Sequence, residues 1–330
     1  MSYGVVTENW SDQEVFVLSG PDGAKATILP WGANLIQLAL PVGRADTAVE
    51  LLSAPEDFKA LEENPTRYGC PILYPFPSRI SAGRFTFAGQ EFQVDVYPDG
   101  NARHGFVHNR MFTAAGLGSG PDGAWVTLVF DGNIADIQRQ FPFPFELTIT
   151  YRLAEAELAV DVTARNAGGR QMPMGFGWHP YFNMPLLPDG DREQCQLQVP
   201  TSTYWELADD LVPTGRRLPV SGRLDLRSGY SVGETMYDDI LSGVESDENH
   251  WSHASLLDQE AKLKATVSAG PSFREWVIYT PPQRAAVCLE PYTCVGNAFN
   301  LHAAGVDAGV IVLAPGESWS DTMKVTLSHL

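Results

Sequence analysis

Four short segments of the sequence place a reactive side chain beside glycine, proline or aromatic residues. The reactive side chains in these segments are those of Arg79, His104, His179 and Glu290. Carboxylates and imidazoles are the usual acids and bases of enzymes, and an arginine can stabilise developing negative charge. These residue types are therefore the candidates for acid–base chemistry, provided that the fold brings them together.

The segment 174–183, Met-Gly-Phe-Gly-Trp-His-Pro-Tyr-Phe-Asn, surrounds His179 with aromatic residues. Gly175 and Gly177 allow a close approach of backbone or ligand, and Pro180 cannot continue a sheet ladder. A strand should therefore end near His179 and place its imidazole at an aromatic-lined opening. Such an opening suits a sugar, which has apolar faces and polar edges. A histidine packed among core aromatic residues is the alternative interpretation.

The other candidates also have purely structural interpretations. Glu290 follows an apolar run and precedes a proline, and a buried carboxylate without a partner is costly. It could nevertheless cap a turn, and Arg79 could form a surface salt bridge. The adjacent Asp238 and Asp239 could be a solvated pair in a loop. The local sequence leaves these alternatives open.

The sequence gives little support for a metal site. His104 and His108 are four residues apart, a spacing that brings two ligands together on a helix. Gly105 and the neighbouring strand patterns argue against a helix at this position. The four cysteines contain no Cys-x-x-Cys pair; they are Cys70, Cys195, Cys288 and Cys294. We therefore expect neither a structural zinc site nor a disulfide scaffold.

Composition and charge argue against several classes of protein. The 330 residues include 22 basic and 40 acidic ones, which gives a formal net charge of −18. Nucleic acids and anionic membrane surfaces attract positive charge, so we expect neither as a partner. The first ten residues lack the basic and apolar regions of a signal peptide, and no apolar run approaches the roughly 20 residues of a membrane helix. We therefore expect a reduced, cytoplasmic location.

The elements that would position the candidate residues are mainly β-strands. Apolar and polar residues alternate through 145–153 and 158–164, and the short segment 154–157 between them predicts a hairpin. The same period of two predicts half-buried strands over 85–96, 263–267 and 323–327.

Helical signals are few. Ser53-Ala-Pro-Glu56 resembles a capping box and predicts a short helix through about Leu61, and 133–140 predicts another short helical turn. The 24 prolines and 30 glycines provide the many turns that short strands require. The sequence therefore predicts an all-β fold, a large sandwich that forms one domain over residues 1–330.

The order of short motifs along the chain resembles the aldose 1-epimerase (galactose mutarotase) family. The resemblance runs from about Tyr68 to the C-terminus and rests on many weak motifs that follow the order of the family. These include Ser78-Arg-Ile-Ser-Ala-Gly-Arg-Phe85, His104-Gly-Phe106, His179-Pro-Tyr-Phe182, Val212-Pro-Thr-Gly215, Tyr279-Thr-Pro281, Cys288-Leu-Glu-Pro291 and Asn297-Ala-Phe-Asn300. One departure is Ser78, where the family usually has asparagine.

The resemblance implies a large antiparallel β-sandwich of the galactose mutarotase-like type with few short helices. It also implies an isomerase that interconverts the α and β anomers of a free hexose by ring opening and reclosure, without a cofactor or a metal. Carried over by motif, Glu290 is the base that removes the anomeric proton, and His179 is the acid that protonates the ring oxygen. Arg79 and His104 would hold the sugar.

The resemblance leaves part of the site open. Asp238 is the better match to the hydroxyl-binding aspartate of the family because it leads the pattern Asp-Asp-Ile-Leu, and Asp239 is the alternative. Neither the preferred aldose nor the oligomeric state follows from the sequence.

Three other functions compete with this interpretation. A hexose-6-phosphate 1-epimerase of the same superfamily is the nearest, and Arg103 and Arg110 could receive its phosphate. A non-catalytic carbohydrate-binding protein would not need both Glu290 and His179. A glycosidase needs two carboxylates, and Glu290 has no obvious acidic counterpart.

Overall fold

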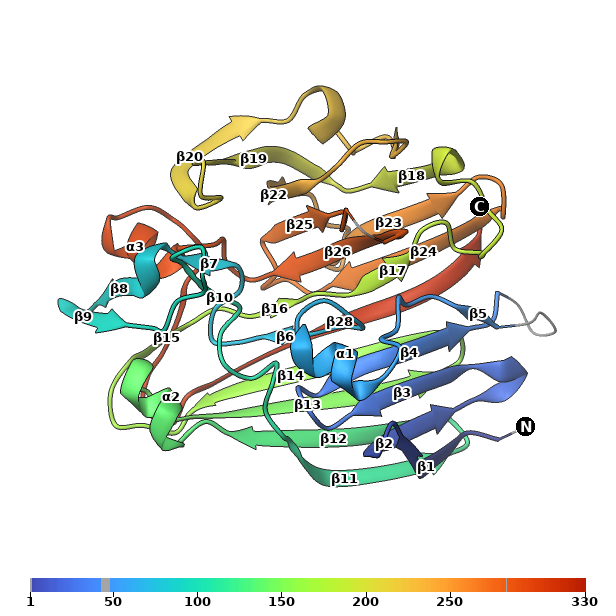
Figure 1. Ribbon diagram of the computed structural model, residues 1–330, viewed down its shortest axis with the longest axis horizontal. Coiled ribbons are helices and arrows are strands. Elements are labelled where there is room, and N and C mark those ends of the chain that lie inside the picture. The colour runs from blue at the N-terminus through green and yellow to red at the C-terminus, as the bar shows by residue number, and fades with distance from the viewer. Residues whose placement is uncertain (1, 43–47, 283) are drawn as a thin grey trace.

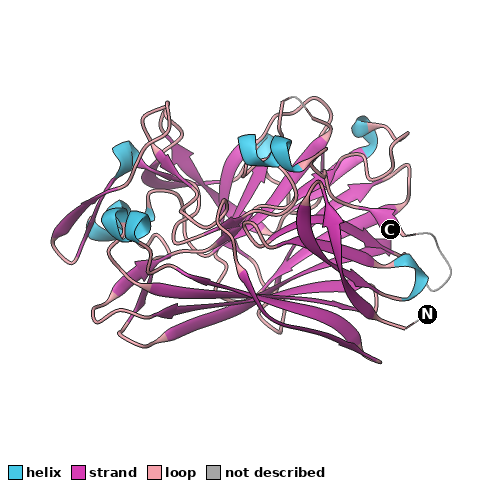
Figure 2. Ribbon diagram, turned by 60° about the horizontal axis from the view of Figure 1, so that its bottom comes forward, coloured by secondary structure: helices cyan, strands magenta, loops and turns pink. Residues whose placement is uncertain are grey.

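The computed structural model describes residues 2–42, 48–282 and 284–330. The described chain is an antiparallel β-sandwich in which strands form stacked layers and the short helices lie among the connecting loops (Figure 1, Figure 2). This architecture confirms the all-β class and the sandwich that the sequence predicts.

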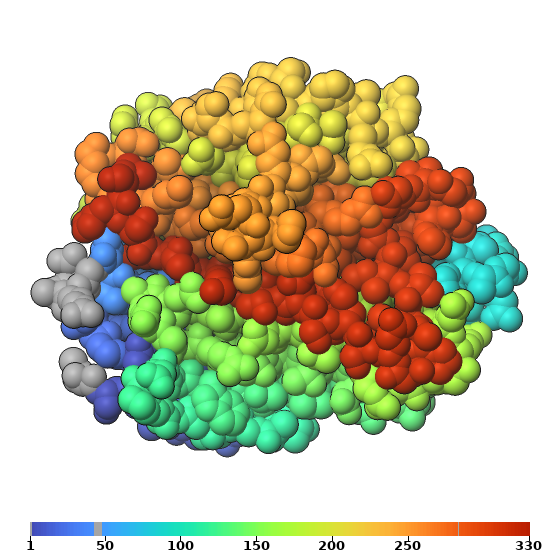
Figure 3. Space-filling view, turned by 180° about the vertical axis from the view of Figure 1, so that it is seen from behind, coloured from blue at the N-terminus to red at the C-terminus, as the bar shows by residue number. Residues whose placement is uncertain are grey.

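The largest sheet has nine strands. In spatial order these are β11 (Thr113–Gly120), β12 (Gly123–Asp131), β13 (Phe145–Ala154), β14 (Glu157–Asn166), β28 (Ser318–His329), β24 (Leu263–Ala269), β23 (Ser252–Asp258), β18 (Cys195–Gln198) and β21 (Tyr230–Ser231). β28 therefore lies between β14 and β24. In the view from behind, a red band of C-terminal residues accordingly separates the green residues of the middle of the chain from the orange residues near position 250 (Figure 3).

A smaller N-terminal sheet packs beside this large sheet. Its strands, in order, are β1 (Gly4–Trp10), β2 (Gln13–Ser19), β3 (Lys25–Leu29), β4 (Asn34–Leu40) and β5 (Val49–Glu50). β1 contacts β11 and β12, and β2 contacts β12 and β13. The N-terminal strands therefore cover one face of the hairpin region of the large sheet.

The second large sheet has eight strands, and two of the candidate residues, Asp238 and Glu290, lie on them. Its main path is β20 (Pro213–Pro219), β19 (Thr201–Leu207), β22 (Asp238–Val244), β25 (Glu275–Tyr279), β26 (Ala286–Tyr292), β16 (Gly177–Trp178) and β6 (Ile72–Leu73), and β17 (Tyr181–Asn183) also pairs with β26. β26 is therefore an internal strand, and it is buried along its whole length.

Three two-stranded pairs and a few short helices complete the described structure. The pairs are β7 (Arg79–Ile80) with β10 (Ala102–Arg103), β8 (Arg84–Phe87) with β9 (Gln90–Gln93), and β15 (Met172–Met174) with β27 (Ile311–Leu313). The α-helices are α1 (Phe58–Glu63), α2 (Ala135–Gln140) and α3 (Ala298–Ala303), and the 3₁₀ turns are Pro21–Gly23, Ser81–Gly83, Arg192–Gln194 and Gly222–Leu224. None of the described helices has the length and apolarity that a membrane span requires.

One cluster of buried apolar side chains runs through all three sheets. It includes Leu18 from the N-terminal sheet, Ile149 and Val325 from the nine-stranded sheet, and Trp178 and Ile278 from the eight-stranded sheet. Burying a large apolar side chain stabilises the fold by about 1.5–3 kcal/mol, so this shared core holds the layers together. One domain over residues 1–330 stays a prediction.

The local predictions hold with two corrections. β13 and β14 confirm the hairpin, with alternating burial and a turn at 155–156. The helix predicted from Ser53 instead starts at Phe58, because the side chain of Asp57 accepts the Ala60 N–H at 2.7 Å and the Ser53 hydroxyl binds Arg284. The strand predicted to reach residue 96 ends at 93, and the side chain at 96 is exposed.

Candidate active site

One pocket is lined by all five residues to which the sequence assigns a role: Arg79, His104, His179, Asp238 and Glu290. They come from distant parts of the chain, and the eight-stranded sheet supplies the residues of β22 and β26. Other side chains that line this pocket include those of Arg67, Arg103, Tyr181, Tyr279 and Tyr292. The tertiary structure therefore gathers the predicted residues into one cavity.

Glu290 lies on β26, between β25 and the β16–β17 segment. Its side chain is almost completely buried, with 1% of its surface exposed. The strand does not end at the following proline, because Pro291 pairs with Trp276 on β25 and Tyr292 faces both Gly177 on β16 and Glu275 on β25. Because β26 is paired on both sides, the backbone of Glu290 is held in place, and this limits where its carboxylate can lie.

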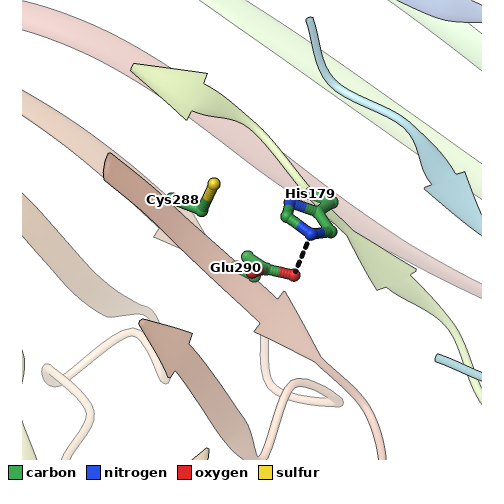
Figure 4. A group of neighbouring side chains, drawn as sticks. All are labelled: His179, Cys288 and Glu290. Carbon is green, nitrogen blue, oxygen red and sulfur yellow. Dashed lines mark ion pairs between the residues drawn. The ribbon is translucent and has the colours of Figure 1, made fainter. Parts of the chain in front are cut away.

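His179 follows β16, which ends at Trp178 as the Gly-Trp-His-Pro pattern predicts. Its ring stacks on the ring of Tyr181, with centroids 4.6 Å apart and an interplanar angle of 7°. Nε2 of His179 lies 3.4 Å from Oε2 of Glu290 (Figure 4). The stacked tyrosine therefore fixes the plane of the imidazole beside the carboxylate.

Arg79 and His104 are brought together by the pairing of β7 with β10. The register places Arg103 opposite Arg79, and the next residue, His104, donates its backbone N–H to the Ser78 carbonyl at 2.9 Å. Gly105 has φ of +70°, and a Cβ there would collide with the Tyr74 carbonyl group. This glycine is required for the close backbone contact that sets the position of His104.

The structure separates the two adjacent aspartates that the sequence left open. Asp239 forms a two-bond ion pair with Arg223, at 2.6 and 2.9 Å, and does not line the pocket. Asp238 lines the pocket, where desolvation raises the pKa of its carboxyl and Arg79 opposes the rise. The geometry therefore favours Asp238 as the aspartate that a ligand would meet.

Burial shifts the pKa values of Glu290 and His179 in opposite directions. The pKa of Glu290 is raised well above its usual value by desolvation and by the nearby Asp238, against a hydrogen bond from Tyr292 that lowers it. The pKa of His179 is lowered to about 3 by desolvation, and the positive charge of Arg284 lowers it further. Each shift disfavours the charged form of its group.

His104 is also held neutral. Desolvation lowers its pKa well below the usual value, and the neighbouring His179 and Arg79 act in the same direction. Its Nδ1 is buried and has no hydrogen-bond partner within the described residues, as is also true of Nε of Arg79. Unpaired buried polar atoms are costly, so these two atoms indicate where a polar ligand would be received.

His179, Cys288 and Glu290 have ligand atoms within 4.8 Å of one another, a spacing that could hold a metal ion (Figure 4). A metal would require the Cys288 thiolate, and burial together with the negative charge of Glu290 raises the pKa of this thiol well above its usual value. The site therefore opposes the deprotonation that metal binding needs. His108 lies elsewhere, with its Nδ1 3.3 Å from the backbone carbonyl of His104.

The residues of the pocket that the sequence did not single out include Tyr292, Tyr279 and Arg67. Tyr292 stands two residues after Glu290, and the period of two on a strand could have placed it on the same face. Tyr279 belongs to the motif Tyr279-Thr-Pro281, but its ring contacts that of His179, with centroids 6.2 Å apart. This contact joins segments that are far apart in the sequence, so the local sequence could not indicate it. No local signal marks Arg67.

The two arginines considered for a phosphate have different places in the structure. Arg103 lines the pocket, where it pairs with Asp99 at 3.4 Å and lies over the ring of Tyr97. Arg110 forms an ion pair with Asp136 and does not line the pocket. Only Arg103 of the two could contact a ligand there.

The family model described as aldose 1-epimerase matches residues 14–326. Human galactose mutarotase is 25% identical over 284 residues, which cover 84% of this chain and 78% of that protein. A maltose epimerase from Levilactobacillus brevis is 29% identical over 279 residues, covering 83% of this chain and 78% of that protein.

A crystal structure of a galactose mutarotase-like protein from Clostridium acetobutylicum has the same fold. It superposes with a TM-score of 0.90 and covers 100% of this chain and 99% of its own, at 23% sequence identity. The match of the family model to nearly the whole chain, together with this fold, shows that the protein belongs to the aldose 1-epimerase family.

Proposed function

We propose that this protein is an aldose 1-epimerase that interconverts the α and β anomers of a free hexose. The observation that carries the proposal is the buried pair of Glu290 and His179, 3.4 Å apart in a pocket that Arg79, His104 and Asp238 also line. A carboxylate and an imidazole at this spacing can act on two oxygens of one sugar ring.

In the ring-opening step, the carboxylate of Glu290 removes the proton of the anomeric hydroxyl while the protonated His179 donates a proton to the ring oxygen. The endocyclic C–O bond breaks and the carbonyl of the open-chain aldehyde forms. Glu290 is then protonated and His179 is a neutral imidazole, and burial favours the neutral form of each group. Rotation about the first carbon–carbon bond and the reverse transfers close the ring on the other face.

The other three residues have roles that match their charges. Arg79 can stabilise negative charge that develops at the ring oxygen, His104 can hydrogen-bond a sugar hydroxyl, and Asp238 can accept hydrogen bonds from two hydroxyls. The aromatic rings of Tyr181 and Tyr279 would pack against the apolar face of the sugar. The named relatives act on galactose and maltose, and both are neutral sugars.

The proposal is tested by following the optical rotation of freshly dissolved α-glucose and α-galactose with and without the purified protein. We expect the approach to anomeric equilibrium to accelerate in proportion to the concentration of protein. Binding of the sugar without acceleration would instead support a non-catalytic carbohydrate-binding protein.

A cytoplasmic location stays a prediction, which the four free cysteines favour.

A second candidate function is the epimerisation of a phosphorylated hexose. The observation that favours it is the presence of Arg67 and Arg103 in the lining of the pocket, because arginines are the usual partners of a phosphate. Against it, Arg103 is already paired with Asp99, and the net charge of −18 repels an anion. We therefore place the neutral hexose first.

A further inference from the structure

Glu290 has a second partner besides His179. The hydroxyl of Tyr292 donates a hydrogen bond of 2.6 Å to Oε2, the same carboxylate oxygen that lies 3.4 Å from Nε2 of His179. The two residues are two positions apart on β26, so their side chains point to the same face of the strand. An O–H···O contact this short is typical of a charge-assisted hydrogen bond.

The ring of Tyr292 is held in place by its packing. Only 1% of the residue is exposed, and the register of β16 with β26 places it opposite Gly177. A Cβ at residue 177 would lie 2.7 Å from Cδ1 and Cε1 of Tyr292, so the tyrosine ring fills the space that the missing side chain leaves. The hydroxyl is therefore positioned by the sheet itself.

Several titratable groups face Glu290. They are His179 before β17, Tyr181 on β17, Asp238 on β22, and Cys288 and Tyr292 on β26, whereas β25 presents the apolar Val277 opposite Glu290. Burial and the charge of Asp238 raise the pKa of Glu290, and the hydrogen bond from Tyr292 lowers it. The pKa of Tyr292 is itself raised well above its usual value by burial, so this hydroxyl stays protonated and remains a donor.

We propose that Tyr292 is a positioning residue that keeps Glu290 available as a carboxylate and directs its other oxygen, Oε1, toward the substrate. Tyr292 and His179 both lie at Oε2, so Oε1 is the atom left to take the anomeric proton. This inference rests on the proposed function, because it assigns a task to Tyr292 in the reaction of Glu290. It adds a residue that lies outside the motif-based assignments.

The test is the variant Tyr292→Phe, which keeps the ring and removes the donor. Loss of a hydrogen bond to a charged group should lower kcat/KM for the mutarotation of glucose or galactose by about 10-fold or more near neutral pH. The acidic limb of the pH profile should move upward by at least about one pH unit, so that activity recovers toward the wild-type value at higher pH. KM should change less than kcat.

The matched control is Tyr151→Phe. The hydroxyl of Tyr151 also makes a buried 2.6 Å hydrogen bond, to the Ala33 carbonyl, but it lies outside the pocket. This control should lower the melting temperature without moving the pH profile. If Tyr292→Phe changed only the melting temperature, Tyr292 would have no role in the reaction. If it lowered activity equally at every pH, the proposal that Tyr292 keeps Glu290 available as a carboxylate would be wrong.

A measurement that does not use activity separates this inference from the proposed function. The infrared carbonyl band of a protonated carboxyl, assigned by its loss in Glu290→Gln, reports the charge of Glu290 directly during a pH titration. Its midpoint should move upward in Tyr292→Phe. If the wild-type protein proved inactive on every aldose, the proposed function would fail, and an unmoved midpoint would still overturn the role of Tyr292.

Discussion

Nε2 of His179 lies 3.4 Å from Oε2 of Glu290, and only 7% and 1% of the two side chains are exposed. This distance is longer than a strong hydrogen bond, as is common for catalytic pairs before a substrate binds. The two groups are thus close enough to serve one ring, and neither is locked to the other. Their chemistry is open to direct test.

We expect Glu290→Gln and His179→Asn each to lower kcat by at least about 100-fold, because each substitution removes one of the two proton-transfer groups. Optical rotation measures the rate, and circular dichroism checks that the fold is retained. Cys288→Ser is the matched control, since Cys288 is the third side chain of the same buried cluster and has no proposed task. Near-normal turnover of Glu290→Gln would show that the base lies elsewhere.

Asp238→Ala should weaken sugar binding by about 10-fold or more, because a hydrogen bond to a charged group is lost from the pocket. Asp239→Ala should weaken it far less, since Asp239 is occupied by Arg223 and does not line the pocket. Calorimetric titration of both variants with galactose compares the two effects. The reverse order would transfer the sugar-binding role to Asp239.

Glucose and galactose should be better substrates than glucose 6-phosphate. The pairing of Arg103 with Asp99 leaves little free positive charge for a phosphate, and the net charge of −18 slows the approach of an anion. Catalytic efficiencies measured at equal ionic strength decide this, because salt screens only the charged substrate. A higher efficiency on glucose 6-phosphate that disappears in Arg103→Ala would contradict the preference for neutral sugars. Arg110→Ala is the control and should keep that efficiency, because Arg110 pairs with Asp136 outside the pocket.

Glu275 should make stability depend on pH. Its pKa is raised to about 7 by burial, against hydrogen bonds from Ser242 and Trp205. Because the pKa is higher in the folded than in the unfolded protein, the protonated Glu275 stabilises the fold. This stabilisation is complete below about pH 4.5 and is lost as the pH rises through about 7. The difference in free energy of unfolding between the wild type and Glu275→Gln should therefore fall by about 3 kcal/mol from pH 4.5 to about pH 8.

Urea unfolding at a series of pH values measures this difference. Using the difference between the two proteins cancels the opposite effect of the buried histidines, whose pKa values are lowered. A difference that did not change with pH would show that the pKa of Glu275 is not raised in the folded protein.

Gly105→Ala should destabilise the protein by on the order of 3 kcal/mol, because the new methyl group meets the Tyr74 carbonyl and the backbone has φ of +70°. Gly100→Ala is the matched control, since Gly100 has φ of +86° but open space around it, and it should cost only about 1 kcal/mol. Thermal or urea unfolding compares the variants. Equal losses would mean that the close contact at Tyr74 does not matter.

The sequence by itself determined the class of fold and the main catalytic candidates. Alternation of apolar and polar residues through 145–153 is a local property, and β13 follows it because a strand turns every second side chain to the core. The ordered motifs around His179 and Glu290 likewise indicated the family, and the tertiary structure brings both residues into one pocket. The catalytic roles themselves stay predictions.

Only the tertiary structure decided the features that depend on partners far along the chain. The pattern Asp-Asp-Ile-Leu favours Asp238 and leaves Asp239 as an alternative, and it is the structure that pairs Asp239 with Arg223 and places Asp238 in the pocket lining. The space that Gly177 leaves for Tyr292 likewise joins two strands separated by more than a hundred residues. The charge states of buried groups also depend on the complete fold, because desolvation is set by everything that packs around a side chain and not by its neighbours in sequence.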